Sequence, residues 1–200
     1  MAKDQKREAI IDAAQKRFNH FGVGKTTMNE IADDLSISKA SLYYYFPDKL
    51  NLFAAVLQKI IANEEGKEQK YIKETNPLTA LLKYLDNRTE FIIQHYNILE
   101  YLKTIGTGTP KELEPVFSAA RSREKTTIAF IISRAVELKK LKVEDPENIA
   151  ALLNDCLDGL RIAVISRKTN FFPDKKQFYQ LADREKQVAT IFIKGLAQAE

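Results

Sequence analysis

The chain has 200 residues, 44% of them hydrophobic, with 31 Lys and Arg against 27 Asp and Glu for a net charge of +4. This apolar content allows a sizeable core and argues against disorder. No stretch approaches the roughly 18 uninterrupted apolar residues that a membrane-spanning helix needs. The single cysteine, Cys156, excludes an intrachain disulfide. Because the charged N-terminus lacks the hydrophobic region of a signal peptide, we expect a cytoplasmic protein without a membrane partner.

Helical periodicity runs through almost the whole chain, and the alternation typical of strands is missing. The predicted fold class is therefore all-α. The first helix is expected over residues 4–21, and Gly22 suits a left-handed cap at its end. Its inward-facing residues are predicted to be Ile10, Ala14, Phe18 and Phe21.

Residues 27–46 predict two short helices joined by a tight turn, the pattern of a helix-turn-helix. Thr27 and Glu30 have the spacing of a capping box, and Ser38 can cap the second helix. Leu42 and Phe46 are expected to point inward, which leaves the other side of the second helix exposed. Small, basic and aromatic residues on that side suit contact with base edges and phosphates in a DNA groove.

The same segment resembles the tetracycline-repressor (TetR) family of bacterial regulators. The resemblance covers about residues 10–53, and Ser36 stands where the family usually has glycine, so the turn is expected to need a strained or different backbone. Pro47-Asp48 also replaces the commoner polar pair before the lysine. The motifs that carry the resemblance are Thr26-Thr27, Ile31-Ala32, Ser36-Ile37-Ser38, Leu42-Tyr43-Tyr44-Tyr45-Phe46 and Lys49.

The resemblance implies a homodimer that binds a palindromic double-stranded DNA operator and is released by an unidentified small-molecule effector. It implies a three-helix DNA-binding head over residues 1–49 and a larger helical domain for ligand binding and dimerisation over 50–200. Lys39, Ala40 and Ser41 are expected to touch base edges, and most of the other contacts to reach the DNA backbone. The predicted DNA-binding residues are Thr26, Thr27, Ser38, Lys39, Ala40, Ser41, Tyr43, Tyr44, Tyr45 and Lys49.

Beyond the head, a long helix is predicted from Lys49 to about Tyr71, followed by one that starts at Asn76-Pro77 and runs through Leu99. Tyr84, Arg88, Phe91 and His95 follow one face of the latter helix. That face can line a ligand cavity with polar and aromatic groups, or it can be core with a polar edge. A Gly/Thr-rich loop at 104–110 comes next, and then helices at 111–118 and 119–141.

The last two helices are expected over 146–167 and from about Asp174 to near Ala197. Both carry wide apolar stripes with small residues along them, which fit either packing within the chain or a dimer interface. The resemblance favours the second, because TetR-type proteins dimerise through their last two long helices as a four-helix bundle. The predicted interface residues are Cys156, Gly159, Leu160, Ala163, Val188, Phe192 and Gly195.

Two other functions compete with this prediction. Gly22-Val23-Gly24-Lys25-Thr26 imitates the end of a phosphate-binding P-loop, but a helix precedes it where a strand is required. A DNA-binding adaptor controlled by a protein partner is the alternative to ligand control. No residues have metal-ligand or catalytic spacing, so we expect no metal, no cofactor and no enzyme, and Cys156 is interpreted as a small hydrophobic residue.

Overall fold

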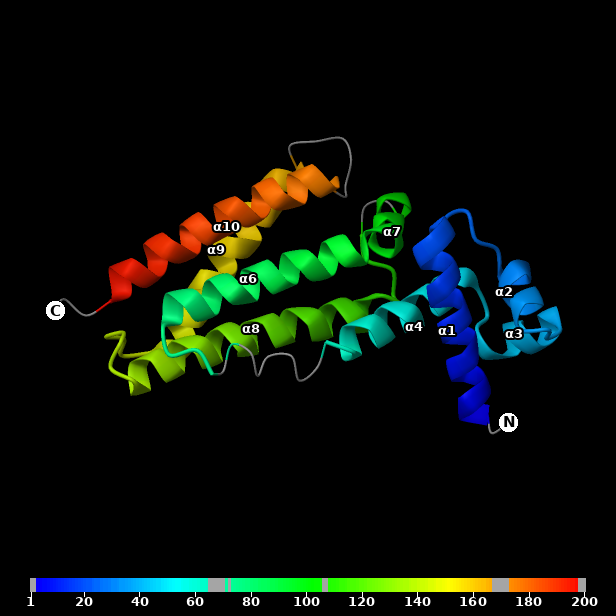
Figure 1. Cartoon of the computed structure of the whole chain (residues 1–200), viewed down its shortest axis with the longest axis horizontal. Coiled ribbons are helices and arrows are strands. Elements are labelled where there is room, and N and C mark those ends of the chain that lie inside the picture. Colours follow the sequence, from blue (N-terminus) through cyan, green and yellow to red (C-terminus); the bar gives the residue numbers. More distant parts are fainter. Residues whose placement is uncertain (1–2, 65–70, 72, 106–107, 167–172, 198–200) are drawn as a thin grey trace. The chain divides into compact units, whose positions relative to one another are not determined.

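The computed structural model describes residues 3–64, 71, 73–105, 108–166 and 173–197. Helices make up its regular structure (Figure 1), and within these ranges strand-like pairing is limited to an isolated bridge between Leu141 and Ala197. The predicted all-α fold class is confirmed.

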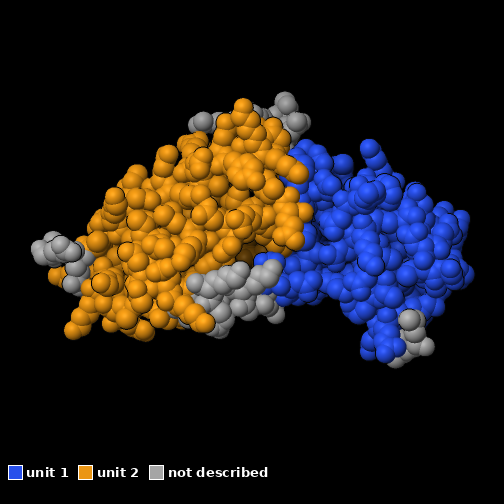
Figure 2. All heavy atoms as spheres, viewed as in Figure 1, with its two compact units in different colours: residues 1–65, 95–118 blue, residues 66–94, 119–200 orange. Residues whose placement is uncertain are grey.

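The chain folds into two compact units, coloured separately in Figure 2. Unit 1 comprises residues 1–65 and 95–118, and unit 2 comprises residues 66–94 and 119–200. The chain therefore passes from unit 1 into unit 2, returns to unit 1 at residue 95 and continues in unit 2 from residue 119. The boundary predicted at residue 49 concerns function rather than compactness, and it stays a prediction.

Unit 1 is built on the contacts of its first helix. Helix α1 (Lys3–Phe21) packs on α2 (Met28–Asp34), α4 (Lys49–Ala62) and α7 (Tyr96–Leu99), and α2 packs on α3 (Lys39–Tyr45). The 3-10 helix η1 (Glu100–Thr104) continues directly from α7. The buried apolar side chains of α1 to α4 include Ile10, Ala14, Phe18, Ile31, Leu42, Phe46 and Phe53.

Local capping groups explain where the short helices of unit 1 begin and end. Gly22 has a φ of +79° and donates its amide to Phe18 O at 3.0 Å, which confirms the predicted left-handed cap. Thr27 and Glu30 form the predicted capping box. Ser38 accepts a hydrogen bond from Ser41 N at 3.1 Å, and Asp48 accepts one from Asn51 N at 2.8 Å at the start of α4.

Phe21 is not the core residue that the helical periodicity predicted. Its side chain is 53% exposed, and its ring lies edge-on to His20 and 5.7 Å from the Arg17 guanidinium. Val23, just beyond the Gly22 turn, is buried instead. The turn of the chain at Gly22 thus brings in the next apolar residue, which periodicity along one helix cannot foresee.

The middle of the chain differs from the sequence expectation in three places. The helix predicted from residue 76 to 99 ends early, so that α6 spans Pro77–Gln94 and α7 follows separately. No proline or glycine marks this break, so the local sequence carries no signal for it. The helices predicted at 111–118 and 119–141 form one helix, α8 (Glu114–Glu137), with Pro115 in its first turn. The helix predicted over 49–71 ends at Ala62 as α4, and residues 65–70 lie outside the described residues.

Unit 2 contains α6, most of α8, α9 (Pro146–Ser166) and α10 (Lys175–Leu196). Figure 1 shows α10 alongside α6 and α9, the two helices that it contacts. The described bounds of α9 and α10 match the predicted bounds to within one or two residues. The core of this unit contains Leu81, Leu85, Ile128, Ile132, Ala135, Leu141, Ala150, Leu153, Leu157, Ala189 and Ile193.

A cluster of charged residues lies within unit 2 and links four helices. Arg161 of α9 donates hydrogen bonds to Glu185 of α10 at 2.5 Å and to both carboxylate oxygens of Glu124 of α8, at 2.7 and 2.9 Å. Arg88 of α6 lies 3.8 Å from Glu124 and 3.6 Å from Glu185. Asp158, also of α9 and more exposed than Arg161, accepts a hydrogen bond from Arg161 Nη1 to its Oδ1 at 2.8 Å. We call these five residues the ionic cluster.

Burial and charge act in opposite directions on the Glu124 carboxylate of the ionic cluster. Burial alone would raise the pKa of Glu124, but Arg88 and Arg161, together with a hydrogen bond from Tyr84, hold that pKa below its usual value. Burial, followed by the nearby Glu124 carboxylate, raises the pKa of Tyr84. Tyr84 is therefore neutral and Glu124 ionised at neutral pH.

Replacing Arg161 with alanine should lower the free energy of unfolding by about 3–5 kcal/mol, because the buried Glu185 and the half-buried Glu124 would lose their main partner. Lys83→Ala is the control, since Lys83 is more than half exposed in its ion pair with Glu74 and its loss should change the free energy of unfolding far less. Urea unfolding followed by circular dichroism measures both. Equal losses in the two variants would contradict a structural role for the ionic cluster.

Arg161→Ala should also change how the free energy of unfolding depends on pH. A lowered folded-state pKa of Glu124 contributes stability above its unfolded-state pKa, and this contribution disappears as the pH falls through the folded-state value. Arg161→Ala removes part of the cause of that low pKa. Its stability should therefore fall less steeply on acidification than that of the unchanged chain, measured by urea unfolding between neutral and acidic pH.

Candidate DNA-binding site and dimer face

The exposed side of α3 carries four of the predicted DNA contacts. Lys39, Ala40, Tyr43 and Tyr44 are exposed, with Tyr44 at 70%. The three consecutive tyrosines do not share an environment. Tyr45 is half-buried, and its ring lies 5.3 Å from that of Tyr44 in an edge-to-face arrangement. This side of α3 therefore presents one ammonium group and two tyrosine side chains beside the small side chain of Ala40.

Ser38 and Ser41 are linked at the N-terminus of α3. Ser38 is exposed and its hydroxyl accepts the amide of Ser41, whose own side chain is half-buried. Both hydroxyl groups lie at the N-terminal turn of α3. Both serines lie on the side of α3 that is predicted to contact DNA, and Ser38 also caps the helix.

Thr26 does not occupy the exposed position that its predicted role requires. Its side chain is only 1% exposed, and its hydroxyl donates to Gly22 O at 2.9 Å. The side chain of Thr27 is exposed, but its hydroxyl donates to the Glu30 carboxylate at 2.8 Å within the capping box. Thr26 is thus a residue of the α1–α2 turn rather than a direct contact in this conformation, whereas Thr27 lies on the surface.

Lys49 faces into unit 1 rather than toward solvent, contrary to the expected phosphate contact. Its Nζ donates to Val23 O at 3.0 Å, Thr26 O at 3.1 Å and Gly24 O at 3.4 Å. It also lies 5.6 Å from the centre of the Tyr101 ring. An ammonium group has three N–H donors, so three carbonyl groups occupy all of them.

An ion-pair network compensates acidic groups on α2. Arg17 of α1 forms a two-bonded pair with Asp34, one bond of which, from Nη2 to Oδ1, measures 2.8 Å, and its Nη1 lies 3.4 Å from Glu30. The hydrogen bonds from Arg17 lower the pKa of Asp34, and those from Thr27 lower the pKa of Glu30. Both carboxylates therefore stay ionised while an arginine offsets their charge next to the candidate DNA-binding surface.

The turn between α2 and α3 has a left-handed residue at Ser36, the position where the family usually has glycine. Ser36 has a φ of +52°, in the left-handed region that favours glycine. The turn is closed by Ser36 N donating to Asp33 O and Ile37 N donating to Ala32 O, both at 3.0 Å. The prediction of a strained backbone at this position is confirmed.

The four residues predicted to bind an effector belong to two different compact units. Tyr84 and Arg88 lie at the ionic cluster, where protein groups already contact them. Phe91 is half-buried in unit 2, and His95 is buried in unit 1. Their role in ligand binding remains a prediction.

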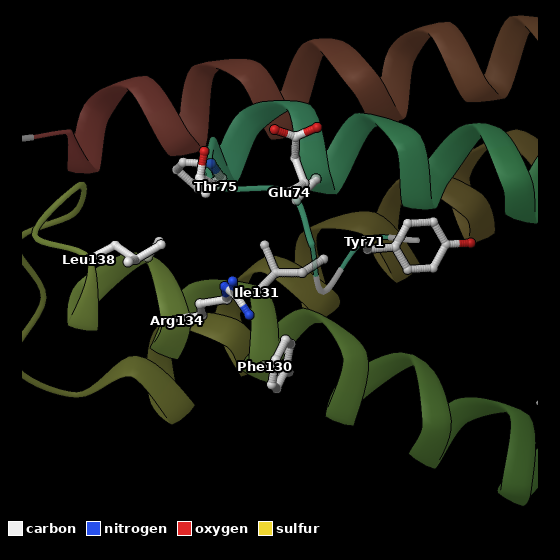
Figure 3. Close-up of a pocket in the computed structure, with 10 residues that line it drawn as sticks. Tyr71, Glu74, Thr75, Phe130, Ile131, Arg134 and Leu138 are labelled. Atoms are coloured by element: carbon white, nitrogen blue, oxygen red, sulfur yellow. The ribbon is translucent and has the colours of Figure 1, made fainter. Parts of the chain in front are cut away.

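A pocket does open in unit 2, between the start of α6 and the C-terminal half of α8 (Figure 3). Its empty volume is about 230 Å³, including space open to solvent. Figure 3 shows Ile131 and Arg134 on α8 on the side toward the segment with Tyr71 and Glu74. The Nε of Arg134 is buried without a hydrogen-bond acceptor. The lining residues are Tyr71, Glu74, Thr75, Pro77, Ala80, Phe130, Ile131, Arg134, Ala135 and Leu138.

Helices α9 and α10 present a surface that packing within the chain does not explain. Cys156, Gly159 and Gly195, all predicted interface residues, are exposed. A Cβ atom at either glycine would meet nothing within 4 Å, so no neighbour in this chain requires glycine there. Leu160, Ala163, Val188 and Phe192 are half-buried, and the last two also pack on the core of unit 2.

The predicted interface omitted the most exposed large apolar side chains of α9 and the central part of α10. Leu152 and Ile162 of α9 are 50% and 62% exposed, and Ile191 of α10 is 74% exposed. Helical spacing places Leu152 and Ile162 near Cys156 and Gly159, and Ile191 near Val188 and Gly195. We call these apolar and small residues of α9 and α10 the α9–α10 face. Such a face on two packed helices is typical of a protein interface.

The described part of the chain holds neither a membrane-spanning helix nor a cluster of metal ligands. Its helices include none long and apolar enough to cross a membrane. Its His, Cys, Asp and Glu residues include no group of three or more arranged to hold a metal ion. The P-loop hypothesis finds no support in the geometry either, since Gly22 ends α1 and Thr26 turns inward.

Comparison with known proteins decides the family. The sequence profile described as "Bacterial regulatory proteins, tetR family" matches residues 10–56. A solved transcriptional regulator from Cytophaga hutchinsonii is 32% identical, with 96% of this chain aligned to 99% of that chain at a TM-score of 0.81. The chain belongs to the tetR family of bacterial regulatory proteins. The tetR family and these relatives are regulators rather than enzymes.

Other tetR-type relatives match less of the chain. The HTH-type transcriptional regulator RutR of Escherichia coli is 34% identical over 89 residues, and the match spans 44% of this chain but only 42% of RutR. SmeT, the repressor of a Stenotrophomonas maltophilia multidrug efflux pump, has been solved with triclosan. That complex is 17% identical, covers 97% of this chain and 92% of its own, and has a TM-score of 0.63, so it shares the fold.

Ser36→Gly should raise the free energy of unfolding by about 0.5–1 kcal/mol. Glycine removes the strain of the left-handed conformation in the folded state, and this gain exceeds the additional chain entropy that glycine loses on folding. Ser122→Gly, the same change in the interior of α8, should lower it by about 0.5 kcal/mol. Thermal and urea unfolding measure both variants. The strain assigned to Ser36 would be refuted if both substitutions were destabilising.

Proposed function

We propose that this tetR-family protein is a cytoplasmic transcriptional repressor that binds a palindromic DNA operator as a homodimer and leaves it when a small molecule binds. The observation that carries the proposal is the exposed side of α3. Lys39, Ala40, Tyr43 and Tyr44 face outward from a helix whose Leu42 is buried and whose ends are capped. A small residue beside basic and tyrosine side chains is what close approach to a DNA groove requires.

The α9–α10 face supports the homodimer. Two copies of this face could form a four-helix bundle in which the exposed Leu152, Ile162 and Ile191 become buried. The glycines and Cys156 would let the partner helices approach closely. A twofold-symmetric dimer would place two α3 helices in successive major grooves, about 34–36 Å apart, which requires a palindromic operator.

Effector control is supported by the fold shared with SmeT, a repressor solved with triclosan. In this chain we propose that the effector enters unit 2, with Tyr84, Arg88 and Phe91 as candidate contacts. An effector releases DNA only if it binds better to the conformation that does not fit the operator. Competition between effector and operator is therefore the defining property of the proposed function.

Variants of α3 should separate base contacts from backbone contacts, once an operator has been selected from random duplexes with the unchanged protein. Tyr43→Ala should weaken binding to every duplex by a similar factor, about tenfold, and keep their rank order. Ser41→Ala and Ala40→Val should change the rank order, because their side chains are expected to meet base edges. Parallel selections with each variant measure this, and the same rank order in all of them would contradict the assignment.

Ile191→Asp should convert the dimer into a monomer, because two copies would bury an unpaired charge at the α9–α10 face. Leu138→Asp is the control, since Leu138 is a 42% exposed apolar residue that lies outside α9 and α10, just beyond the C-terminal end of α8. Sedimentation velocity at micromolar concentration measures the mass of each variant. A dimer with both variants, or a monomer with the unchanged chain, would reject the proposed interface.

A further inference from the structure

The turn between α1 and α2 has a shortage of backbone donors. If α1 continued as a helix, Val23 O would accept the amide of Thr27, and Thr26 O would accept that of Glu30. The capping box uses both amides instead. Thr27 N donates to the Glu30 carboxylate at 2.7 Å, and Glu30 N donates to the Thr27 hydroxyl at 3.3 Å.

Lys49 supplies the missing donors from another helix. Its Nζ contacts the carbonyl oxygens of Val23, Gly24 and Thr26 at 3.0, 3.4 and 3.1 Å. Lys49 is the first residue of α4, so these bonds fasten the start of α4 to the turn that precedes α2. Each hydrogen bond from a charged donor contributes more than a neutral one, so three of them fix the turn firmly.

Tyr101 covers the same ammonium group from a distant part of the chain. Its ring centre lies 5.6 Å from Lys49 Nζ and 5.1 Å from the ring of the buried Phe53. Lys49 and Phe53 are four residues apart on α4 and therefore share one face of that helix. The Phe53 ring holds Tyr101 in place, and the Tyr101 ring presents its face to the ammonium group, which stabilises the charge where water is partly excluded.

We propose that Lys49 is a positioning residue that holds the α1–α2 turn, and with it Thr27, in the shape that meets DNA, and that Tyr101 keeps the Lys49 ammonium on the turn. Lys49 then acts on DNA affinity through the turn and makes no bond to phosphate. The effect on DNA rests on the proposed function, whereas the effect on the turn does not.

The turn can be tested without DNA. Lys49→Met keeps the aliphatic chain and removes the ammonium group, so amide hydrogen exchange of residues 22–28 should become at least about tenfold faster, while exchange in α9 and α10 stays unchanged. Lys140→Met, the same change at an exposed lysine of unit 2, is the control and should leave residues 22–28 protected. Unchanged exchange of these residues in Lys49→Met would overturn the proposal, whatever the protein binds.

Tyr101 provides an independent test that leaves Lys49 in place, and it also serves if Lys49→Met fails to fold. Tyr101→Leu removes the aromatic face and should speed exchange of residues 22–28 by about two- to fivefold, the range expected for a cation–π contact near the surface. Tyr101→Phe retains the ring and should restore the protection. A Tyr101→Leu variant with normal protection would overturn the role of the ring.

DNA binding separates positioning from phosphate contact. Each lost phosphate contact lowers the slope of log affinity against log salt by about 0.9, so loss of one contact per protomer would flatten the slope of a dimer by about 1.8. Lys49→Met should instead weaken binding to a selected operator at every salt concentration with the slope unchanged. A slope flatter by about 1.8 would overturn the proposal. Failure of the unchanged protein to bind any duplex would reject the proposed function, and the exchange measurements would still decide the role of Lys49.

Discussion

Burial of Leu42 and Phe46 keeps α3 folded, because a helix of seven residues has too few internal hydrogen bonds to persist by itself in water. The inward side chains fix which residues face outward, so the outer side of α3 follows directly from the core of unit 1. The caps at Ser38 and Asp48 then fix where α3 starts and where the chain turns into α4. The candidate DNA-binding surface is in this sense a consequence of packing.

Features that depend on neighbouring residues along the chain could be predicted from the sequence. The capping box at Thr27, the left-handed Gly22 and the strained Ser36 all follow from residue type and spacing within one turn. The exposed side of α3 follows from helical periodicity in the same way. These are local preferences, and local preferences agree with the final structure throughout the helix-turn-helix.

Features that depend on distant residues could not be predicted. Lys49 was expected to face DNA, but its donors meet carbonyl groups that are 23 to 26 positions earlier in the chain. Arg88 was expected to face a ligand, yet it lies next to carboxylates from α8 and α10. A charged side chain on a helix looks the same in sequence whether its partner is solvent, DNA or another part of the chain, and only the tertiary arrangement identifies that partner.

The first compact unit is discontinuous in the chain, because residues 95–118 belong to it although residues 66–94 do not. Exchange of DNA specificity between related regulators through a single crossover after α4 would therefore combine a head with a foreign Tyr101 and a foreign α7. Such a chimaera would inherit a mismatched partner for Lys49 and Phe53. Recombination that preserves this unit needs three crossovers, so the DNA-binding head and the segment from His95 to Ser118 are expected to evolve together.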